Sequence, residues 1–132
     1  MLECLILGDS IAVGVSKYRP ECTAHAKVGI NSHNWNSKYN SIDTNAKLVI
    51  ISLGTNDPTK SKTYDELAII RSKIHENTQV FWILPANNNV AQDAVYLIAS
   101  EYRDGILGIQ KLSIDKIHPT PKEYKRLAEV TK

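Results

Sequence analysis

The sequence has few features that would mark it as a nucleic-acid-binding, membrane-spanning or exported protein. Its 16 basic and 14 acidic residues give a formal net charge of +2, and no block of like charge resembles a nucleic-acid-binding arm. No apolar run approaches the roughly 18 residues of a membrane span, and no charged segment followed by an apolar stretch resembles a signal peptide. We therefore expect a cytoplasmic protein that binds neither nucleic acid nor membrane, although a signal sequence removed by processing would leave no trace.

Cysteine is also scarce, with only Cys4 and Cys22 in the chain. Two cysteines in apolar or strand-like surroundings fit buried free thiols better than a disulfide framework, so we expect both to be structural. The 42% hydrophobic and 23% charged fractions are those of an ordinary globular protein and exclude disorder. At 132 residues the chain should form a single domain, 1–132, with one core.

Five short apolar segments predict β-strands, and they alternate with helical patterns. The clearest is 47–53, a nearly continuous aliphatic run of the kind that is buried on both faces of a parallel sheet. Strands that alternate with helices indicate an α/β sheet with right-handed crossovers and helices on both faces, a three-layer sandwich. The predicted strands are 3–7, 23–28, 47–53, 79–84 and 106–109.

Three stretches show apolar residues at helical spacing. The first, 63–76, should begin with a capping box, and the second, 91–102, should end at a glycine. The third, which starts at about residue 120, should begin with a threonine N-cap, followed by a proline in the first turn and by a glutamate that completes a second capping box. These boundary residues are Thr63 with Glu66, Gly105, and Thr120 with Pro121 and Glu123.

Polar or glycine-rich segments follow four of the predicted strands. In parallel α/β sheets ligands bind outside the carboxyl ends of the strands, so we expect these segments to meet on one rim of the sheet. They are 8–10, 29–31, 54–57 and 115–119.

Ser10 could either cap a helix or act as a nucleophile. Ester cleavage needs a hydroxyl nucleophile, a base, a group that orients the base, and donors for the oxyanion. His118 is the best candidate base, because the other three histidines lie within a strand, in a polar loop and at the far end of a helix. Asp115, three residues earlier, can reach the Nδ1–H of His118. The other histidines are His25, His33 and His75.

Asn56 can donate its side-chain amide to an oxyanion, and Gly29 allows a backbone N–H to approach the same point. Each is an ordinary loop residue when taken alone. We expect Asp9 and Asp57, which accompany these motifs, to make local hydrogen bonds rather than to take part in chemistry.

The four segments, in this order, resemble the sequence blocks of the SGNH hydrolases, also called GDSL esterases and lipases, and the resemblance covers residues 5 to about 124. It implies a flavodoxin-like fold with a five-stranded parallel sheet and no metal or cofactor. It also implies that Ser10 is the nucleophile, His118 the base and later the acid, and Asp115 the residue that orients His118. The implied oxyanion hole consists of the N–H groups of Ser10 and Gly29 and the side-chain amide of Asn56.

The chain is short for this family, so only 31–43 and 85–89 remain to shape a substrate pocket. Asn31, Trp35 and Asn87 are the candidate substrate contacts, although Trp35 could equally close the core instead of stacking on a sugar. We expect a serine esterase for short, acetyl-type esters, including O-acetyl groups on carbohydrate. The sequence does not indicate an oligomeric state.

Three other functions are compatible with parts of the sequence. A lysophospholipase or thioesterase would use the same catalytic residues, and a non-catalytic carbohydrate-binding module could use the same scaffold. A phosphoacceptor receiver domain would place Asp9, Asp57 and Lys111 at strand ends, but it lacks the paired acids that Mg²⁺ requires and leaves Asp115 and His118 unexplained.

Overall fold

The computed structural model describes residues 1–132 and contains five strands in one parallel sheet, ordered β2-β1-β3-β4-β5. This flavodoxin-like order confirms the predicted fold class. The second, fourth and fifth strands are shorter than predicted. The strands are β1 (Leu2–Gly8), β2 (Thr23–Ala26), β3 (Ala46–Ser52), β4 (Gln79–Ile83) and β5 (Gly105–Leu107).

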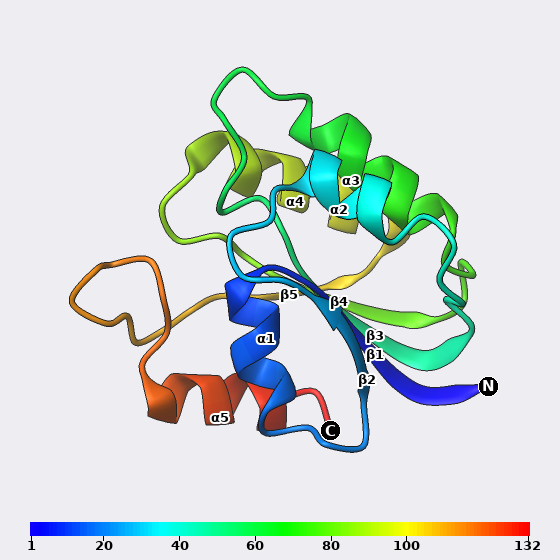
Figure 1. Ribbon diagram of the computed structural model, residues 1–132, viewed down its shortest axis with the longest axis horizontal. Helices are drawn as coiled ribbons and strands as arrows, with labels where there is room; N and C mark the ends of the chain where they lie inside the picture. Colours follow the sequence, from blue (N-terminus) through cyan, green and yellow to red (C-terminus); the bar gives the residue numbers. More distant parts are fainter.

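Helices cover both faces of the sheet, as expected for a three-layer sandwich (Figure 1). Helices α1 and α5 pack on one face, and α2, α3 and α4 pack on the other (Figure 1). No helix has the length and apolar character that crossing a membrane would require. The helices are α1 (Ser10–Ser16), α2 (Ser32–Lys38), α3 (Thr63–Ser72), α4 (Asn89–Tyr102) and α5 (Pro121–Glu129).

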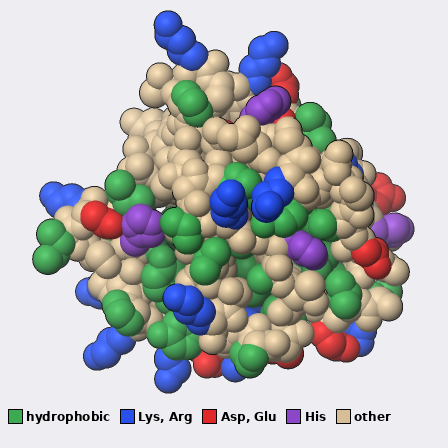
Figure 2. Space-filling model, in the orientation of Figure 1, with side chains coloured by type: hydrophobic (Ala, Val, Ile, Leu, Met, Phe, Trp, Pro, Cys, Tyr) green, Lys and Arg blue, Asp and Glu red, His purple; other side chains and the backbone are tan.

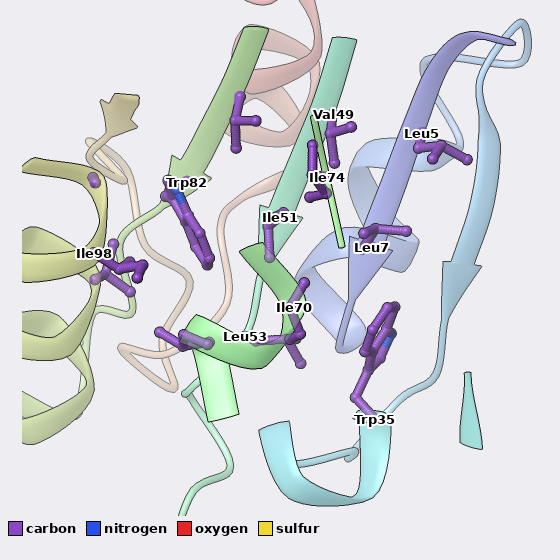
Figure 3. Packing of buried hydrophobic residues seen from close by; sticks show 14 of the residues in the cluster. Leu5, Leu7, Trp35, Val49, Ile51, Leu53, Ile70, Ile74, Trp82 and Ile98 are labelled. Atoms are coloured by element: carbon purple, nitrogen blue, oxygen red, sulfur yellow. The ribbon is translucent and has the colours of Figure 1, made fainter. Parts of the chain in front are cut away.

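The core consists of two apolar clusters, one on each side of the sheet, because successive residues of a strand point to opposite faces. On the β1 strand, Leu5 and Leu7 belong to the larger cluster, beneath α2, α3 and α4, whereas Cys4 and Ile6 belong to the smaller one, beneath α1 and α5. Figure 3 shows the larger cluster, in which side chains of β1, β3 and β4 meet those of the covering helices. Strands β1 and β3 are therefore buried on both faces, as the aliphatic run at 47–53 predicted for β3.

The prediction of two free thiols was wrong, because Cys4 and Cys22 form a disulfide. Leu5 of β1 lies opposite Thr23 of β2. The residues immediately before them, Cys4 and Cys22, are therefore also close to each other. Their Cα atoms are 4.7 Å apart, which is within the range that a disulfide can span. The pairing depends on strand register, which composition does not reveal.

Several predicted helix boundaries were also wrong. Lys62 occupies the N-cap of α3 without a side-chain hydrogen bond, because the Thr63 hydroxyl donates to the carboxylate of Asp57 instead. Helix α4 ends at Arg103 in a left-handed conformation, whereas Gly105 starts β5. For α5, Thr120 is the N-cap as predicted.

The second half of the predicted α5 capping box was wrong. The Glu123 carboxylate does not reach back to the N-cap backbone, and instead accepts hydrogen bonds from the Gln110 backbone N–H and from Arg126. The N–H of Thr120 donates to the Lys111 carbonyl. Glu123 therefore connects α5 to the segment that follows β5, rather than closing its own helix end.

Candidate active site

The turn between β1 and α1 places Ser10 at the carboxyl end of β1. Gly8 has φ +145°, and a Cβ on it would collide with the carbonyl of Ser52, so only glycine fits there. Asp9 is the N-cap of α1, and its Oδ1 accepts hydrogen bonds from the Ile11 N–H (3.0 Å) and the Ser52 hydroxyl (3.1 Å). Asp9 therefore performs the capping, and the hydroxyl of Ser10 is left free for another partner.

That partner is His118. The Ser10 Oγ lies 2.9 Å from Nε2 of His118, and Nδ1 of the same ring lies 2.7 Å from Oδ2 of Asp115. Three hydrogen bonds, from the His118 and Ile117 backbone N–H groups and the His118 ring, lower the pKa of Asp115 to about 2. An ionised carboxylate can only accept, so Nδ1 carries the proton and Nε2 accepts from the serine hydroxyl.

A tight turn after β5 holds Asp115 and His118 in this arrangement. Leu112 and Pro119 form an antiparallel bridge, and the Ser113 N–H donates to the His118 carbonyl at 2.8 Å. The turn includes Lys116 with φ +59°, a left-handed conformation that is uncommon for non-glycine residues. The backbone, rather than packing around the rings, therefore positions these two side chains, which are 40% (His118) and 46% (Asp115) exposed.

The two candidate oxyanion donors lie in neighbouring loops. Asn56 follows β3, and its Nδ2 donates to the Ile30 carbonyl in the loop after β2 at 3.1 Å. An amide nitrogen carries two hydrogens, so this bond leaves one N–H of Asn56 available. Gly29 has φ +80° and open space around it, and its N–H donates no hydrogen bond to the protein. The strand order reverses between β1 and β3, so the loop after β3 lies where such sheets bind ligands. The hydrogen bond from Asn56 to the Ile30 carbonyl joins the loop after β2 to it.

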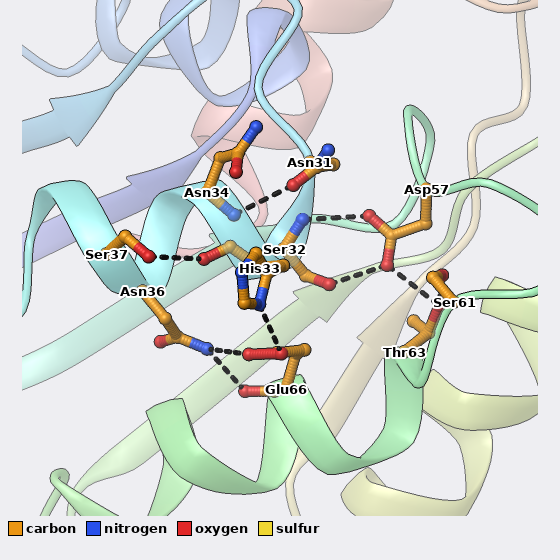
Figure 4. A network of polar contacts seen from close by, with 10 residues as sticks. All are labelled: Asn31, Ser32, His33, Asn34, Asn36, Ser37, Asp57, Ser61, Thr63 and Glu66. Carbon is orange, nitrogen blue, oxygen red and sulfur yellow. Dashed lines mark hydrogen bonds and ion pairs between the residues drawn. The ribbon is translucent and has the colours of Figure 1, made fainter.

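Asp57 joins these loops to two helices, as Figure 4 shows. Its carboxylate accepts from the Ser32 N–H at 2.8 Å and from the hydroxyls of Ser32 and Thr63. Asp57 thus connects the loop after β3 with the first turns of α2 and α3. Asp9 makes one local hydrogen bond, to the Ile11 N–H, as expected. The expectation of local bonds was wrong for Asp57, because its partner Ser32 is 25 residues away in the sequence, and no local pattern gives a signal for Ser32.

The structure changes the interpretation of the three candidate substrate contacts. Trp35 is 2% exposed and belongs to the core, and its Nε1 donates to the His25 carbonyl at 2.9 Å, so it cannot be a stacking platform. Asn31 caps α2, with its side-chain oxygen bonded to the Asn34 N–H. Asn87 is exposed in the loop between β4 and α4, and neither Asn31 nor Asn87 contacts Ser10 or His118 by hydrogen bond.

The three other histidines are accounted for elsewhere. His25 lies in β2, and His33 pairs with Glu66 at 3.0 Å (Figure 4). The Nδ1 of His75 accepts from the Asn77 N–H. Of the four histidines, only His118 forms a hydrogen bond with Ser10.

One cluster of three potential metal ligands exists, formed by Cys4, Glu21 and Cys22. The disulfide occupies both sulfur atoms, so they cannot act as thiolate ligands. The expected absence of a metal or cofactor at Ser10 stays a prediction.

Burial of Asp9 predicts a pH-dependent stability. Its side chain is fully buried and its Oδ2 has no hydrogen-bond partner, and this burial raises its pKa from 3.8 to about 6. The folded state therefore holds the proton to higher pH than the unfolded chain, so Asp9 lowers the free energy of unfolding as pH rises from about 4 to about 6. Asp9→Asn, which keeps the Oδ1 acceptor, should remove this decline in urea unfolding curves.

The matched control is Asp93→Asn, which removes an exposed carboxylate on α4. The control should leave the pH profile unchanged. Parallel profiles for the wild type and Asp9→Asn between pH 4 and 6 would contradict the assigned ionisation of Asp9.

No protein-family model matches the sequence, and no curated protein matches it either. Solved structures do match. A proposed acylhydrolase from Bacteroides fragilis superposes with a TM-score of 0.67 at 15% identity, covering 97% of this chain and 83% of the other. The catalytic C-terminal domain of peptidoglycan O-acetyltransferase A from Streptococcus pneumoniae, carrying a methylsulfonyl adduct, gives 0.60 at 15% identity, covering 98% and 91%.

A third match is a two-domain esterase active on acetylated mannans, crystallised with mannopentaose. It gives a TM-score of 0.60 at 17% identity and covers 97% of this chain. This chain spans 47% of that protein. At such identities the matches show the fold alone, a flavodoxin-like α/β sandwich.

Proposed function

We propose that this protein is a serine ester hydrolase that acts through an acyl-enzyme on Ser10. The observation that carries the proposal is the continuous chain of hydrogen bonds from Ser10 through His118 to Asp115. Such a chain is the arrangement that nucleophilic acyl transfer requires. The fold shared with acylhydrolases and O-acetyl esterases supports the same conclusion.

In the proposed mechanism, Nε2 of His118 accepts the hydroxyl proton as the Ser10 Oγ attacks the ester carbonyl. Asp115 stabilises the resulting imidazolium and keeps its orientation. His118 then donates this proton to the departing alkoxide, which leaves as the alcohol. Water attacks the acyl-enzyme by the same sequence of proton transfers, and this step releases the acid and restores Ser10.

The negative charge that develops on the carbonyl oxygen needs donors that are already in place. We assign this role to the N–H groups of Ser10 and Gly29 and to the side-chain amide of Asn56. The Ser10 N–H lies in the first turn of α1, where backbone N–H groups have no partner within the helix, and it donates no other hydrogen bond. The Asn56–Ile30 hydrogen bond holds the loops after β2 and β3 together.

We propose short acyl groups, and in particular O-acetyl groups on carbohydrate, as the substrate. The hollow that borders the site includes Gly29 but is mostly polar, and none of the surface hollows is lined by Ser10 or His118. The hollow with the most apolar lining includes Val90 and Leu97 of α4 and is formed by α3, α4 and the segment before α3, and none of its lining residues belongs to the triad. A long acyl chain would thus find little surface to bury it.

The chain-length dependence of hydrolysis tests this substrate class. Each buried CH₂ is worth about 0.8 kcal/mol, so an enzyme with an acyl groove gains with chain length and one without it does not. On p-nitrophenyl esters from acetate to palmitate, kcat/KM should be highest at acetate or butyrate and fall steeply beyond. A maximum at eight carbons or more would instead favour the lysophospholipase or thioesterase function.

A non-catalytic carbohydrate-binding module would hydrolyse none of these esters, so the same series separates it from both hydrolases.

The disulfide between Cys4 and Cys22 bears on the localisation of the protein, because disulfides persist mainly outside the cytosol. It weighs against the expected cytoplasmic localisation, which stays a prediction.

A further inference from the structure

A hollow with two lysines lies beside the proposed active site. It is formed by residues 27–30 after β2 and by Asn34, Ser37 and Lys38 of α2, and it has a volume of about 610 Å³. We refer to it as the Lys27–Lys38 hollow. The Lys27 N–H donates to the Gly8 carbonyl at 3.0 Å, two residues before Ser10. Gly29, whose N–H we assign to the oxyanion hole, is part of its wall, so a substrate whose carbonyl oxygen is bound by Gly29 would lie at its border.

The charge of this hollow is unbalanced. No acidic residue lines it, and neither Lys27 nor Lys38 takes part in any of the ion pairs of the structure. Figure 2 shows that basic and acidic side chains are scattered over the visible face, with two basic side chains next to each other near its middle; the figure does not name them, and the residues of the hollow come from its lining. By contrast, Lys47 and Lys132 each have a carboxylate partner. The Lys38 Nζ lies 5.6 Å from the centroid of the Tyr39 ring, a contact that leaves its charge uncompensated. The two ammonium groups therefore create a positive potential in the hollow that includes Gly29.

The rest of the lining suits a polar, anionic group. The exposed side-chain amide of Asn34 can donate hydrogen bonds to hydroxyl or anionic oxygens, and the Ser37 hydroxyl, which donates to the His33 carbonyl at 3.4 Å, can accept from sugar hydroxyls. Only Val28 and Ile30 are apolar. Lysine ammonium groups on flexible stems bind oxyanions as point charges and tolerate different geometries. A neutral ester would gain nothing from them.

We propose that the substrate is an ester of an anionic sugar, whose carboxylate or phosphate group binds Lys27 and Lys38 while its acyl group lies at Ser10. This proposal rests on the esterase function proposed above and names the substrate class of that site. Exposed ion pairs contribute up to about 1 kcal/mol each, which corresponds to roughly fivefold in kcat/KM per lysine. The preference should also weaken with salt, because both ammonium groups are exposed.

The test compares an O-acetylated methyl glucuronoside with the matched O-acetylated methyl glucoside. In the wild type, kcat/KM should be roughly five- to tenfold higher for the uronoside at low ionic strength, and the ratio should fall towards one in 0.5 M NaCl. The Lys27→Gln, Lys38→Gln double variant should have a ratio near one at every salt concentration. The control variant is Lys125→Gln, an exposed, unpaired lysine on α5, and it should keep the wild-type ratio.

A binding measurement separates the anion site from catalysis. Titration with methyl glucuronoside and with glucose 6-phosphate, followed by NMR shifts of the α2 amides, should show binding to the wild type and weaker binding to the double variant. The stronger of the two ligands distinguishes carboxylate from phosphate recognition. A ratio of one in the wild type, with methyl glucoside binding as well as either anion, would overturn the proposal while leaving the esterase function standing. Anion binding without hydrolysis of any ester would support the anion site and contradict the esterase function.

Discussion

Replacing Ser10 by alanine is expected to lower kcat for ester hydrolysis by several orders of magnitude while the protein stays folded. The variant removes the proposed nucleophile, and in serine hydrolases loss of the nucleophile or its base costs on the order of 10⁶ in kcat. The Ser10 side chain makes no hydrogen bond apart from that to His118, and Asp9 caps the helix, so the fold should not depend on it. Circular dichroism and urea unfolding check the fold, and p-nitrophenyl acetate measures the activity.

His118→Ala should have an effect of similar size, and the double variant should be little worse than either single one, because the two residues act as a unit. Asp115→Ala should be milder, since it removes the group that orients the base but not the base itself. His75→Ala is the matched control, as it removes an exposed imidazole remote from Ser10. Wild-type activity in a folded Ser10→Ala protein would contradict the assignment of Ser10 as the nucleophile.

Asn56→Ala is expected to lower kcat by roughly 10²–10³-fold with little change in KM, because a lost oxyanion donor acts mainly in the transition state. Kinetics over a range of acetate-ester concentrations separate the two constants. The substitution also removes the hydrogen bond to the Ile30 carbonyl, so unfolding measurements must accompany it.

The control for Asn56 is Asn77→Ala, which truncates an exposed asparagine before β4, at the opposite end of the strands. It should leave both kinetic constants unchanged. A rise in KM with unchanged kcat for Asn56→Ala would place Asn56 in ground-state binding instead of the oxyanion hole.

The strands and the position of the site could be predicted because local information determines them. The aliphatic run at 47–53 and the alternation of strands and helices are sufficient for a parallel α/β sheet, and strand order then places 8–10 and 54–57 on one rim. The approach of His118 to Ser10 involves residues 108 positions apart. It was predicted because both follow strands, because their chemistry is complementary, and because the resemblance of the four segments to a known hydrolase family implies it.

Other features depend on tertiary contacts that local patterns do not reveal. Helix α2 has mostly polar residues, so the sequence suggested a pocket loop, and the contact between Ser32 and Asp57 shows what anchors its start. Trp35 sits among polar neighbours in sequence yet turns into the core. The Cys4–Cys22 disulfide follows from the register of β1 and β2, which no single-strand pattern contains.

Labelling with a fluorophosphonate probe tests the central claim most directly, because the reaction requires an activated serine and no knowledge of the natural ester. Peptide mapping after labelling should find the probe on Ser10, and labelling should be absent in Ser10→Ala and strongly reduced in His118→Ala. A folded wild-type protein that stays unlabelled, or that carries the probe on another residue, would contradict the assignment of Ser10 as the nucleophile.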